Sequence, residues 1–291
     1  MRFPAMILLV ALVVPVFADE SEPWRKQFNE TYKLEEGQCL KRIPPPFIPE
    51  REIYYKVVDS GQAQHIPKPP DYFTFHWDGG LKQWGCGFTS GAKQSTGSVL
   101  DSILMMKNYE YQLFPELAKF KMNGDWIIDT KAESSVKLAA LCNIIKQAGG
   151  PGAKFTQKDL PRKVVVATGE YVPHPLTDIH HPTWIHLYVD KPDPTEGSGG
   201  GSGDFKELLE MLGSRVGMQV IDEVIGDKPA RLTWGHHSST NLAQLAGLPD
   251  GPQRDERIAK LLEIVSQQTE IHFKQELRML PTWVAEPVEA R

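Results

Sequence analysis

Histidines offer the most direct route to chemistry in this chain, which contains nine of them among 291 residues. His186 lies in a stretch that alternates like a strand, and His236-His237 follow a second strand candidate. Adjacent residues of a strand point to opposite faces, so His236 and His237 do not form a chelate by themselves. A hydrolytic site would have to combine His186 and His237 with an acid such as Asp222, brought together by the fold.

Motifs that specify a metal site or a nucleophile are absent from the sequence. The chain has no His-Glu-x-x-His motif or its inverted form, no Cys-x-x-Cys pair and no zinc-ligand spacing of His and Cys. The run Gly199–Gly203 misses the Gly-x-Ser-x-Gly spacing of a hydrolase nucleophile, and Ser202 has no base nearby in sequence. We therefore expect no metal and no cofactor.

Three cysteines are far apart in the sequence, and their odd number leaves at least one thiol unpaired in a monomer. Cys142 recurs with apolar residues at helical spacing, which favours a buried thiol. The only pair that we consider for a disulfide is Cys39 with Cys86.

Apolar periodicity indicates a mixture of helices and strands that would position these residues. The predicted helices span residues 98–107, 136–145, 204–212 and 254–268, with Ser98 and Asp204 as N-caps. The predicted strands span residues 126–128, 163–167, 184–189, 218–221, 231–234, 271–274 and 281–285.

Two segments resemble each other at a distance of 273 − 155 = 118 residues. Residues 155–160 and 273–277 both follow an amphipathic helix and precede a strand that ends in Val-Ala. A duplication and a local similarity of pattern are both open explanations. We expect an α+β fold with a proline-rich N-terminal arm and two related lobes, each a helix packed on a small mixed or antiparallel sheet. The expected parts are the arm (19–70), the first lobe (71–190), a Gly/Ser-rich loop (191–203) and the second lobe (204–288).

The first 18 residues have the pattern of an export signal. Arg2 precedes an uncharged apolar run that ends at Val16, and small residues precede the predicted cleavage point after Ala18. A retained membrane anchor is the alternative, but the run is shorter than the roughly 20 residues that span a bilayer. We expect a periplasmic or extracellular protein without a membrane span after cleavage.

The charge balance disfavours one class of partner. The formal net charge is −5, charged residues make up 24% of the chain, and no basic stripe is visible. Since nucleic acid binding requires a concentrated basic surface, we expect no nucleic acid partner. The oligomeric state is open.

Several short segments together carry a resemblance to a known family. They are Gly124–Trp126, Arg162–Gly169, Trp184–Asp190, Gly199–Gly203, Leu208–Gly213, Val220–Glu223, Leu232–Trp234, His237–Ser239 and Gln267–Thr269. In this order and spacing they resemble the exported "soil-associated" domain of unknown function of environmental bacteria, over roughly residues 85–288. Its members stand alone, or are appended to membrane metallopeptidases of the antibiotic-sensor type or to thioredoxin-like domains. The resemblance implies no catalytic residue.

The resemblance also changes one interpretation of the composition. Composition alone predicts a flexible linker at 191–203, whereas the recurrence of the glycine run ahead of a Leu-Leu-x-x-Leu-Gly helix implies a structured loop. An anion site at that helix start is disfavoured, because the carboxylate of Asp204 would occupy the free amides.

Two hypotheses of function follow from these observations. The leading one is a non-enzymatic extracytoplasmic binding or assembly module, which presents a strand edge or a cleft to an envelope protein partner. The alternative is a secreted hydrolase whose site forms between the two lobes from His186, His237 and Asp222.

Overall fold

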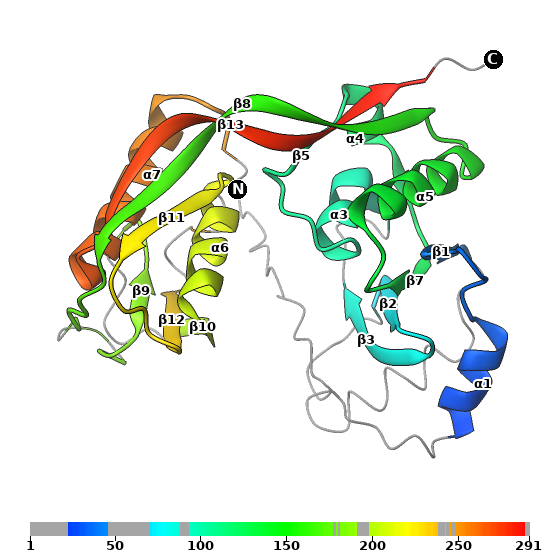
Figure 1. The fold of residues 1–291 in the computed structure, drawn as a ribbon, viewed down its shortest axis with the longest axis horizontal. Helices are drawn as coiled ribbons and strands as arrows, with labels where there is room; N and C mark the ends of the chain where they lie inside the picture. Colours follow the sequence, from blue (N-terminus) through cyan, green and yellow to red (C-terminus); the bar gives the residue numbers. More distant parts are fainter. Residues whose placement is uncertain are drawn as a thin grey trace, which may run out of the picture. The chain divides into compact units, whose positions relative to one another are not determined.

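The computed structural model describes residues 23–45, 70–87, 93–176, 179, 181–190, 198–237, 242, 245 and 248–288. Within these residues the chain forms six helices and thirteen strands in several small mixed sheets, without a closed barrel (Figure 1). This confirms the predicted α+β class. The predicted signal peptide and much of the proline-rich arm lie outside the described residues.

The chain divides into two compact units. Unit 1 comprises residues 1–157 and 283–291, and unit 2 comprises residues 158–282. The division falls within two long strands, whereas the sequence placed it at the Gly/Ser-rich segment 191–203. The difference arises because Val165 and Ala167, on a strand that the sequence assigned to the first lobe, are buried in the hydrophobic core of unit 2.

Unit 1 contains four helices and seven complete strands in the part of the chain that the structure describes, together with one end of each long strand. These elements are α1 (Pro23–Thr31), β1 (Leu40–Ile43), β2 (Tyr72–Trp77), β3 (Leu81–Gly87), β4 (Gln94–Ser95), α3 (Thr96–Ser102), β5 (Tyr111–Gln112), α4 (Pro115–Lys119), β6 (Lys121–Met122), β7 (Asp125–Asp129) and α5 (Ser134–Gln147). The largest sheet has the order β1-β7-β2-β3. Helix α5 buries Leu138, Leu141 and Ile145, which recur at the helical spacing that the sequence predicted.

The N-cap of α3 differs from the prediction. Ser95 is the capping residue, and its hydroxyl accepts a hydrogen bond from the backbone N–H of Ser98 at 3.1 Å. Ser98, which the sequence indicated as the cap, therefore lies in the first turn. Both serines precede the same apolar stripe, so local pattern does not separate them.

The sheet of unit 1 excludes the disulfide that the sequence left open. All three cysteines are free thiols. Cys39 adjoins β1, where its carbonyl accepts a hydrogen bond from the N–H of Asp129, and Cys86 pairs with Phe73 at the opposite edge. Strands β7 and β2 lie between them, so the separation is three strand spacings, or about 14 Å. A disulfide requires Cα atoms within about 7 Å.

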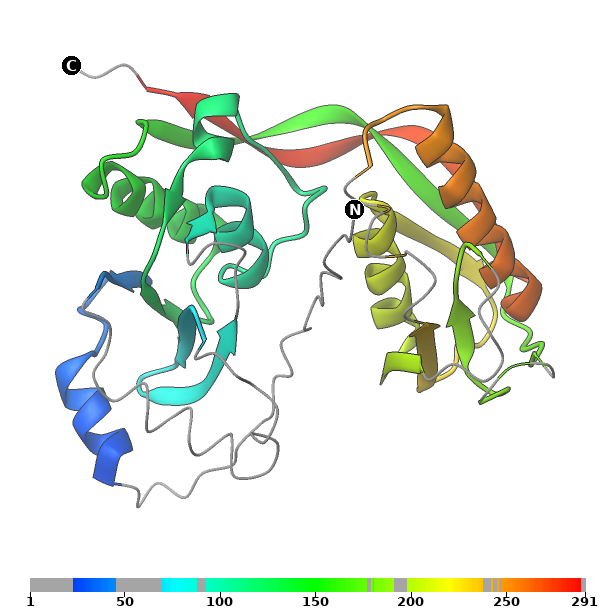
Figure 2. The same ribbon diagram turned by 180° about the vertical axis from the view of Figure 1, so that it is seen from behind.

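Unit 2 is built on two sheets and two long helices (Figure 2). Its elements are β9 (Ile185–Leu187), β10 (Ser198–Gly203), α6 (Phe205–Val216), β11 (Val220–Ile225), β12 (Leu232–His237) and α7 (Pro252–Thr269), with most of β8 (Ala153–Glu170) and β13 (His272–Pro287). One sheet has the order β10-β12-β9, and the other has the order β11-β8-β13-β5.

Both helices of unit 2 follow local sequence signals closely. Asp204 and Glu207 form a reciprocal capping box at the start of α6, in agreement with the predicted cap. Helix α6 ends at Gly217, whose φ of 68° is a left-handed conformation that favours glycine. Helix α7 buries its apolar stripe, including Ile258 and Val265, in the core of unit 2.

Strand β13 merges two strands that the sequence separated, and β8 extends far beyond its predicted bounds. In Figure 1 the two long strands (green and red to orange) run side by side, and they are hydrogen-bonded neighbours. Val165 on β8 lies in the core of unit 2, whereas Trp283 on β13 packs against the core of unit 1. Val165 pairs in parallel with Val220 of β11, and Trp283 pairs in parallel with Tyr111 of β5. Val165 and Trp283 are 118 residues apart, and each pairs with a parallel strand. A duplication of the two segments would produce equivalent pairs of this kind.

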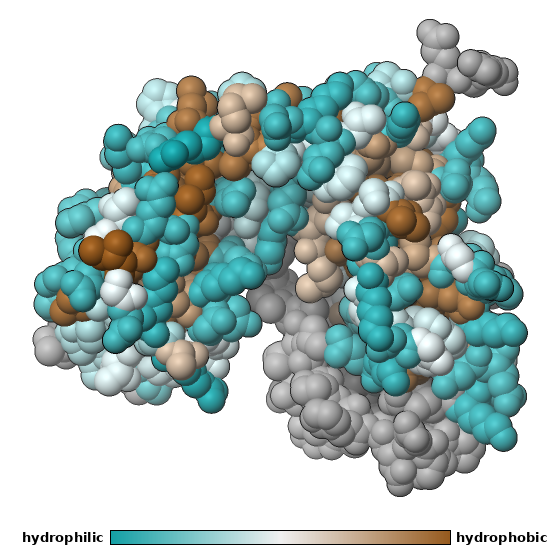
Figure 3. Space-filling model, in the orientation of Figure 1, coloured by the Kyte–Doolittle hydropathy of each residue, from teal (hydrophilic) through white to brown (hydrophobic). Residues whose placement is uncertain are grey.

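The helices of the described residues include none that could span a membrane. None of the helices in the described ranges is long and apolar enough to cross a bilayer. On the face in Figure 3, hydrophilic residues cover much of the described surface, and hydrophobic ones lie among them. The exposed large apolar side chains in the described part are Met105, Val136, Val172, Ile225, Leu277, Met279 and Val288.

Candidate functional site

His186 occupies a structural position in the middle of β9. Its side chain is fully buried, and ring atom Nε2 lies 2.9 Å from the carbonyl oxygen of His181. Its backbone N–H donates to Oε1 of Gln268 at 2.7 Å, and its carbonyl accepts from Nε2 of the same amide at 2.9 Å. A ring held in this way has no face open to a substrate.

Asp222 caps the backbone of its own strand. One carboxylate oxygen accepts a hydrogen bond from the N–H of Val224 at 3.1 Å, and the other accepts one from Nζ of Lys228 at 2.7 Å. Both oxygens therefore have partners, and one of these partners is a backbone N–H of β11 itself. This is a common way to blunt an edge strand.

The three sequence candidates do not share one sheet. His186 lies opposite Gly235 of β12, so the backbone of His237 is two residues further along the neighbouring strand. Asp222 lies on β11, opposite Ala167 of β8 in the other sheet. The structure thus brings the backbones of the two histidines near each other and places Asp222 elsewhere. The side chain of His237 is outside the described part of the chain.

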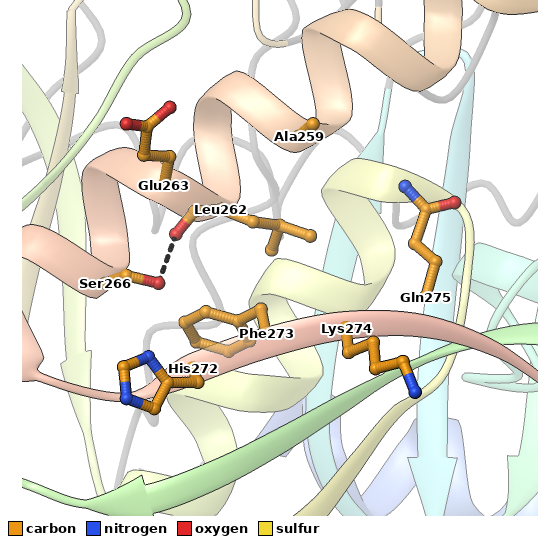
Figure 4. A pocket seen from close by; sticks show the side chains of 8 residues that line it. All are labelled: Ala259, Leu262, Glu263, Ser266, His272, Phe273, Lys274 and Gln275. Atoms are coloured by element: carbon orange, nitrogen blue, oxygen red, sulfur yellow. Dashed lines mark hydrogen bonds between the residues drawn. The ribbon is translucent and has the colours of Figure 1, made fainter.

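A groove of about 450 Å³ lies between α7 and the start of β13 (Figure 4). Its apolar lining includes Leu262 and Phe273, and Phe273 points from β13 toward the helix. The hydroxyl of Ser266 donates to the carbonyl of Leu262 at 3.0 Å, so it is held by its own helix. Glu263 points away from β13 and Lys274 away from α7, so their charges do not converge. The groove therefore lacks the converging polar groups of a catalytic pocket.

Gln268 closes the outer edge of β9, and sequence reasoning missed its role. Its side chain is 3% exposed, and its amide bonds both backbone groups of His186 as a neighbouring strand would. The amide nitrogen also donates to the carbonyl of Ile264 at 2.9 Å. A polar residue that continues the apolar stripe of α7, three positions after Val265, was the available signal.

The backbone alternation of β9 fixes that of its neighbour β12. The N–H and C=O of one strand residue point to the same side, and those of the next residue point to the other side. His186 directs its backbone N–H and C=O outward to Gln268. The backbone N–H and C=O groups of Ile185 and Leu187 therefore point toward β12. They therefore face Gly235, the residue opposite His186.

The same alternation continues into β10 and leaves its outer edge open. Since the backbone N–H and C=O of Gly235 point toward β9, those of Trp234 and His236 point toward β10. Gly200, which lies opposite Gly235, therefore directs its N–H and C=O outward, as do Ser198 and Ser202. Among the described residues, no strand pairs with this side of β10.

Close approach to Trp234 explains why glycine forms this strand. A Cβ at Gly200 would collide with the carbonyl oxygen of Trp234. A Cβ at Gly201 would lie 3.0 Å from Nε1 of the same residue, whose ring crosses the strand there. The Gly/Ser-rich segment is thus ordered at 198–203, as the family resemblance implied and composition alone did not.

Side chains bond backbone groups of three other edge strands. Asp222 caps β11 and Gln268 closes β9. In unit 1, the N–H of Leu81 at the start of β3 donates to Oδ1 of Asn29 on α1 at 2.9 Å. β10 instead presents glycine and serine, with residues 199, 200 and 202 exposed. It is the best candidate for a binding site in the described part of the chain.

Comparison of the chain with protein-family models, curated proteins and solved structures finds no match. The resemblance to the soil-associated family stays a hypothesis.

Proposed function

We propose that this chain is a non-enzymatic binding module, exported from the cytoplasm, that captures an extended segment of an envelope protein. The segment adds as a further strand to the outer edge of β10. Strand addition of this kind gains affinity from main-chain hydrogen bonds and specificity from alternate side chains.

The open edge of β10 is the observation that carries the proposal. Ser198, Gly200 and Ser202 direct backbone donors and acceptors outward. At two other edges, Gln268 bonds both backbone groups of one β9 residue, and Asp222 accepts one N–H of β11. Natural proteins usually cover or charge an edge that has no partner. An edge left open beside two that side chains bond at least in part supports a role in binding.

No observation favours the hydrolase alternative over this proposal. The ring of His186 is fully buried, and both carboxylate oxygens of Asp222 have partners. The hydrolase alternative stays a prediction from the sequence.

Panning the purified full chain against a random library of twelve-residue displayed peptides tests the proposal. Ser202→Pro removes an outward N–H and leaves the groups that pair with β12, since proline is tolerated on an edge whose N–H faces solvent. Ser202→Ala is the matched control, because it removes the hydroxyl and keeps the N–H. We expect the library to yield peptides that bind the wild-type chain and Ser202→Ala, but not Ser202→Pro.

Amide hydrogen exchange provides a second measurement that does not depend on the proline variant. A bound peptide should slow exchange of the Gly200 and Ser202 amides. Equal binding to Ser202→Pro together with unchanged exchange at these two amides would refute the proposal, as would a library that yields no binder.

A further inference from the structure

Arg231 lies at one end of the open edge, with its guanidinium directed at β10. It immediately precedes β12, and its Nη2 atom donates to the hydroxyl of Ser202 at 3.3 Å. The residue is exposed. Ser202 is also one of the residues that direct backbone groups outward, so the positive charge lies beside the part of β10 to which a strand would add.

Arg231 has no ion pair with any described residue, unlike Arg254 and Arg278 of the same unit. Arg254 pairs with Asp250, and Arg278 pairs with Glu223 and Glu276. These pairs show that carboxylates are available to arginines across this unit.

The carboxylates nearest in sequence to the end of β10 are already in use. Asp204 accepts the N–H of Glu207 at 2.8 Å, and Glu207 accepts the N–H of Asp204 at 2.8 Å. This reciprocal capping box holds both charges at the start of α6. The guanidinium of Arg231 therefore keeps most of its five donors for a partner, and its planar fork suits a carboxylate.

We infer that the segment bound at β10 is an acidic extended peptide, with an Asp or Glu side chain placed beside Ser202 and paired with Arg231. This inference rests on the proposed strand addition and adds the chemistry that selects the partner. The backbone groups of β10 bind any extended chain, whereas Arg231 distinguishes a segment that carries a carboxylate at one position.

The size of the effect follows from the exposure of Arg231. Ion pairs at exposed sites contribute modestly, so replacing arginine by a neutral residue should weaken binding by about 1.5- to fivefold. The loss should shrink as salt is raised, because mobile ions screen exposed charges over about 8–10 Å at physiological ionic strength.

The test compares peptide pools selected by the full chain and by three arginine variants from the same twelve-residue library. We expect an Asp or Glu to be enriched at one position in the wild-type pool, and this enrichment to disappear with Arg231→Gln. With Arg231→Glu, Lys or Arg should be enriched at that position. Arg278→Gln is the matched control, because Arg278 is exposed in the same unit but already paired, and its pool should match the wild-type pool.

The outcomes separate this inference from the proposed function. Binders that Ser202→Pro abolishes, but whose pool has no acidic preference or keeps it with Arg231→Gln, overturn the acidic partner and leave strand addition standing. Failure to recover any binder overturns both. A binder whose Kd is unchanged by Arg231→Gln at low salt counts against the inference in the same way.

Discussion

Replacing Gln268 by alanine should destabilise unit 2 strongly, because one side chain satisfies both backbone groups of a buried residue. The amide lies 2.7 Å from the N of His186 and 2.9 Å from its carbonyl oxygen, and the side chain is 3% exposed. Each buried polar group left without a partner costs about 1–3 kcal/mol. Two such groups give an expected loss of roughly 2–6 kcal/mol, a large part of the 5–15 kcal/mol that typically stabilises a folded protein.

Urea unfolding followed by circular dichroism measures this loss, and amide exchange of His186 locates it. Gln267→Ala is the matched control, because Gln267 is the adjacent residue of α7 and is exposed. Its loss should stay within about 0.5 kcal/mol. Equal midpoints for the two variants, or slow exchange of the His186 amide in Gln268→Ala, would refute the assigned role of Gln268.

Gln268→Glu adds a dependence on pH that alanine lacks. The introduced carboxyl would face the carbonyls of His186 and Ile264, so burial and these acceptors should raise its folded-state pKa above the unfolded value. A raised folded-state pKa favours the folded state at low pH, and this contribution disappears as pH rises through the folded-state pKa. The variant should therefore fall further below wild type at pH 7 than at pH 4. A constant difference over that range would contradict the placement of the amide nitrogen.

Three further predictions test other parts of the structure. Gly200→Ala should lower stability by about 1–3 kcal/mol in thermal unfolding, because its Cβ collides with a backbone carbonyl, and an unchanged Tm would contradict the close approach. Burial, with a smaller contribution from Lys137, lowers the pKa of His76 below 6.5 in the folded protein. As pH falls, the imidazole of His76 is protonated in the unfolded chain before it is protonated in the folded protein, so the free energy of unfolding should fall below about pH 6.5. His76→Asn should remove this part of the pH dependence of stability. Oxidising conditions should leave Cys39 and Cys86 unlinked, so mass spectrometry of the alkylated chain should find both modified without prior reduction.

The value of β10 for binding depends on what covers the other edges. Asp222 is attractive as a catalytic acid when only its residue type is considered, yet its carboxylate serves the N–H of Val224 and the ammonium of Lys228. His186 is likewise attractive by type, yet it is the buried residue through which Gln268 seals β9. Two of the three hydrolase candidates thus help to protect edges, which directs attention to the third edge, β10.

The sequence by itself determined the α+β class and much of unit 2's helical structure. The stripe of α7 and the cap of α6 at Asp204 were predicted because apolar periodicity and capping act between residues a few positions apart. The start of α3 was placed three residues late, since Ser95 and Ser98 are equally good local caps. These successes and this error concern interactions that a short window of sequence contains.

Tertiary structure alone decided the candidate site. His186 and Gln268 are 82 residues apart in the chain, and their pairing sets which groups of β12 and then of β10 point outward. The glycine run becomes a strand because β12 approaches it closely, and its composition by itself predicted a flexible linker. Strands β8 and β13 are continuous because each leaves one hydrophobic core and enters another. Edges, registers and cores arise from contacts between distant residues, so they exist only once the chain has folded.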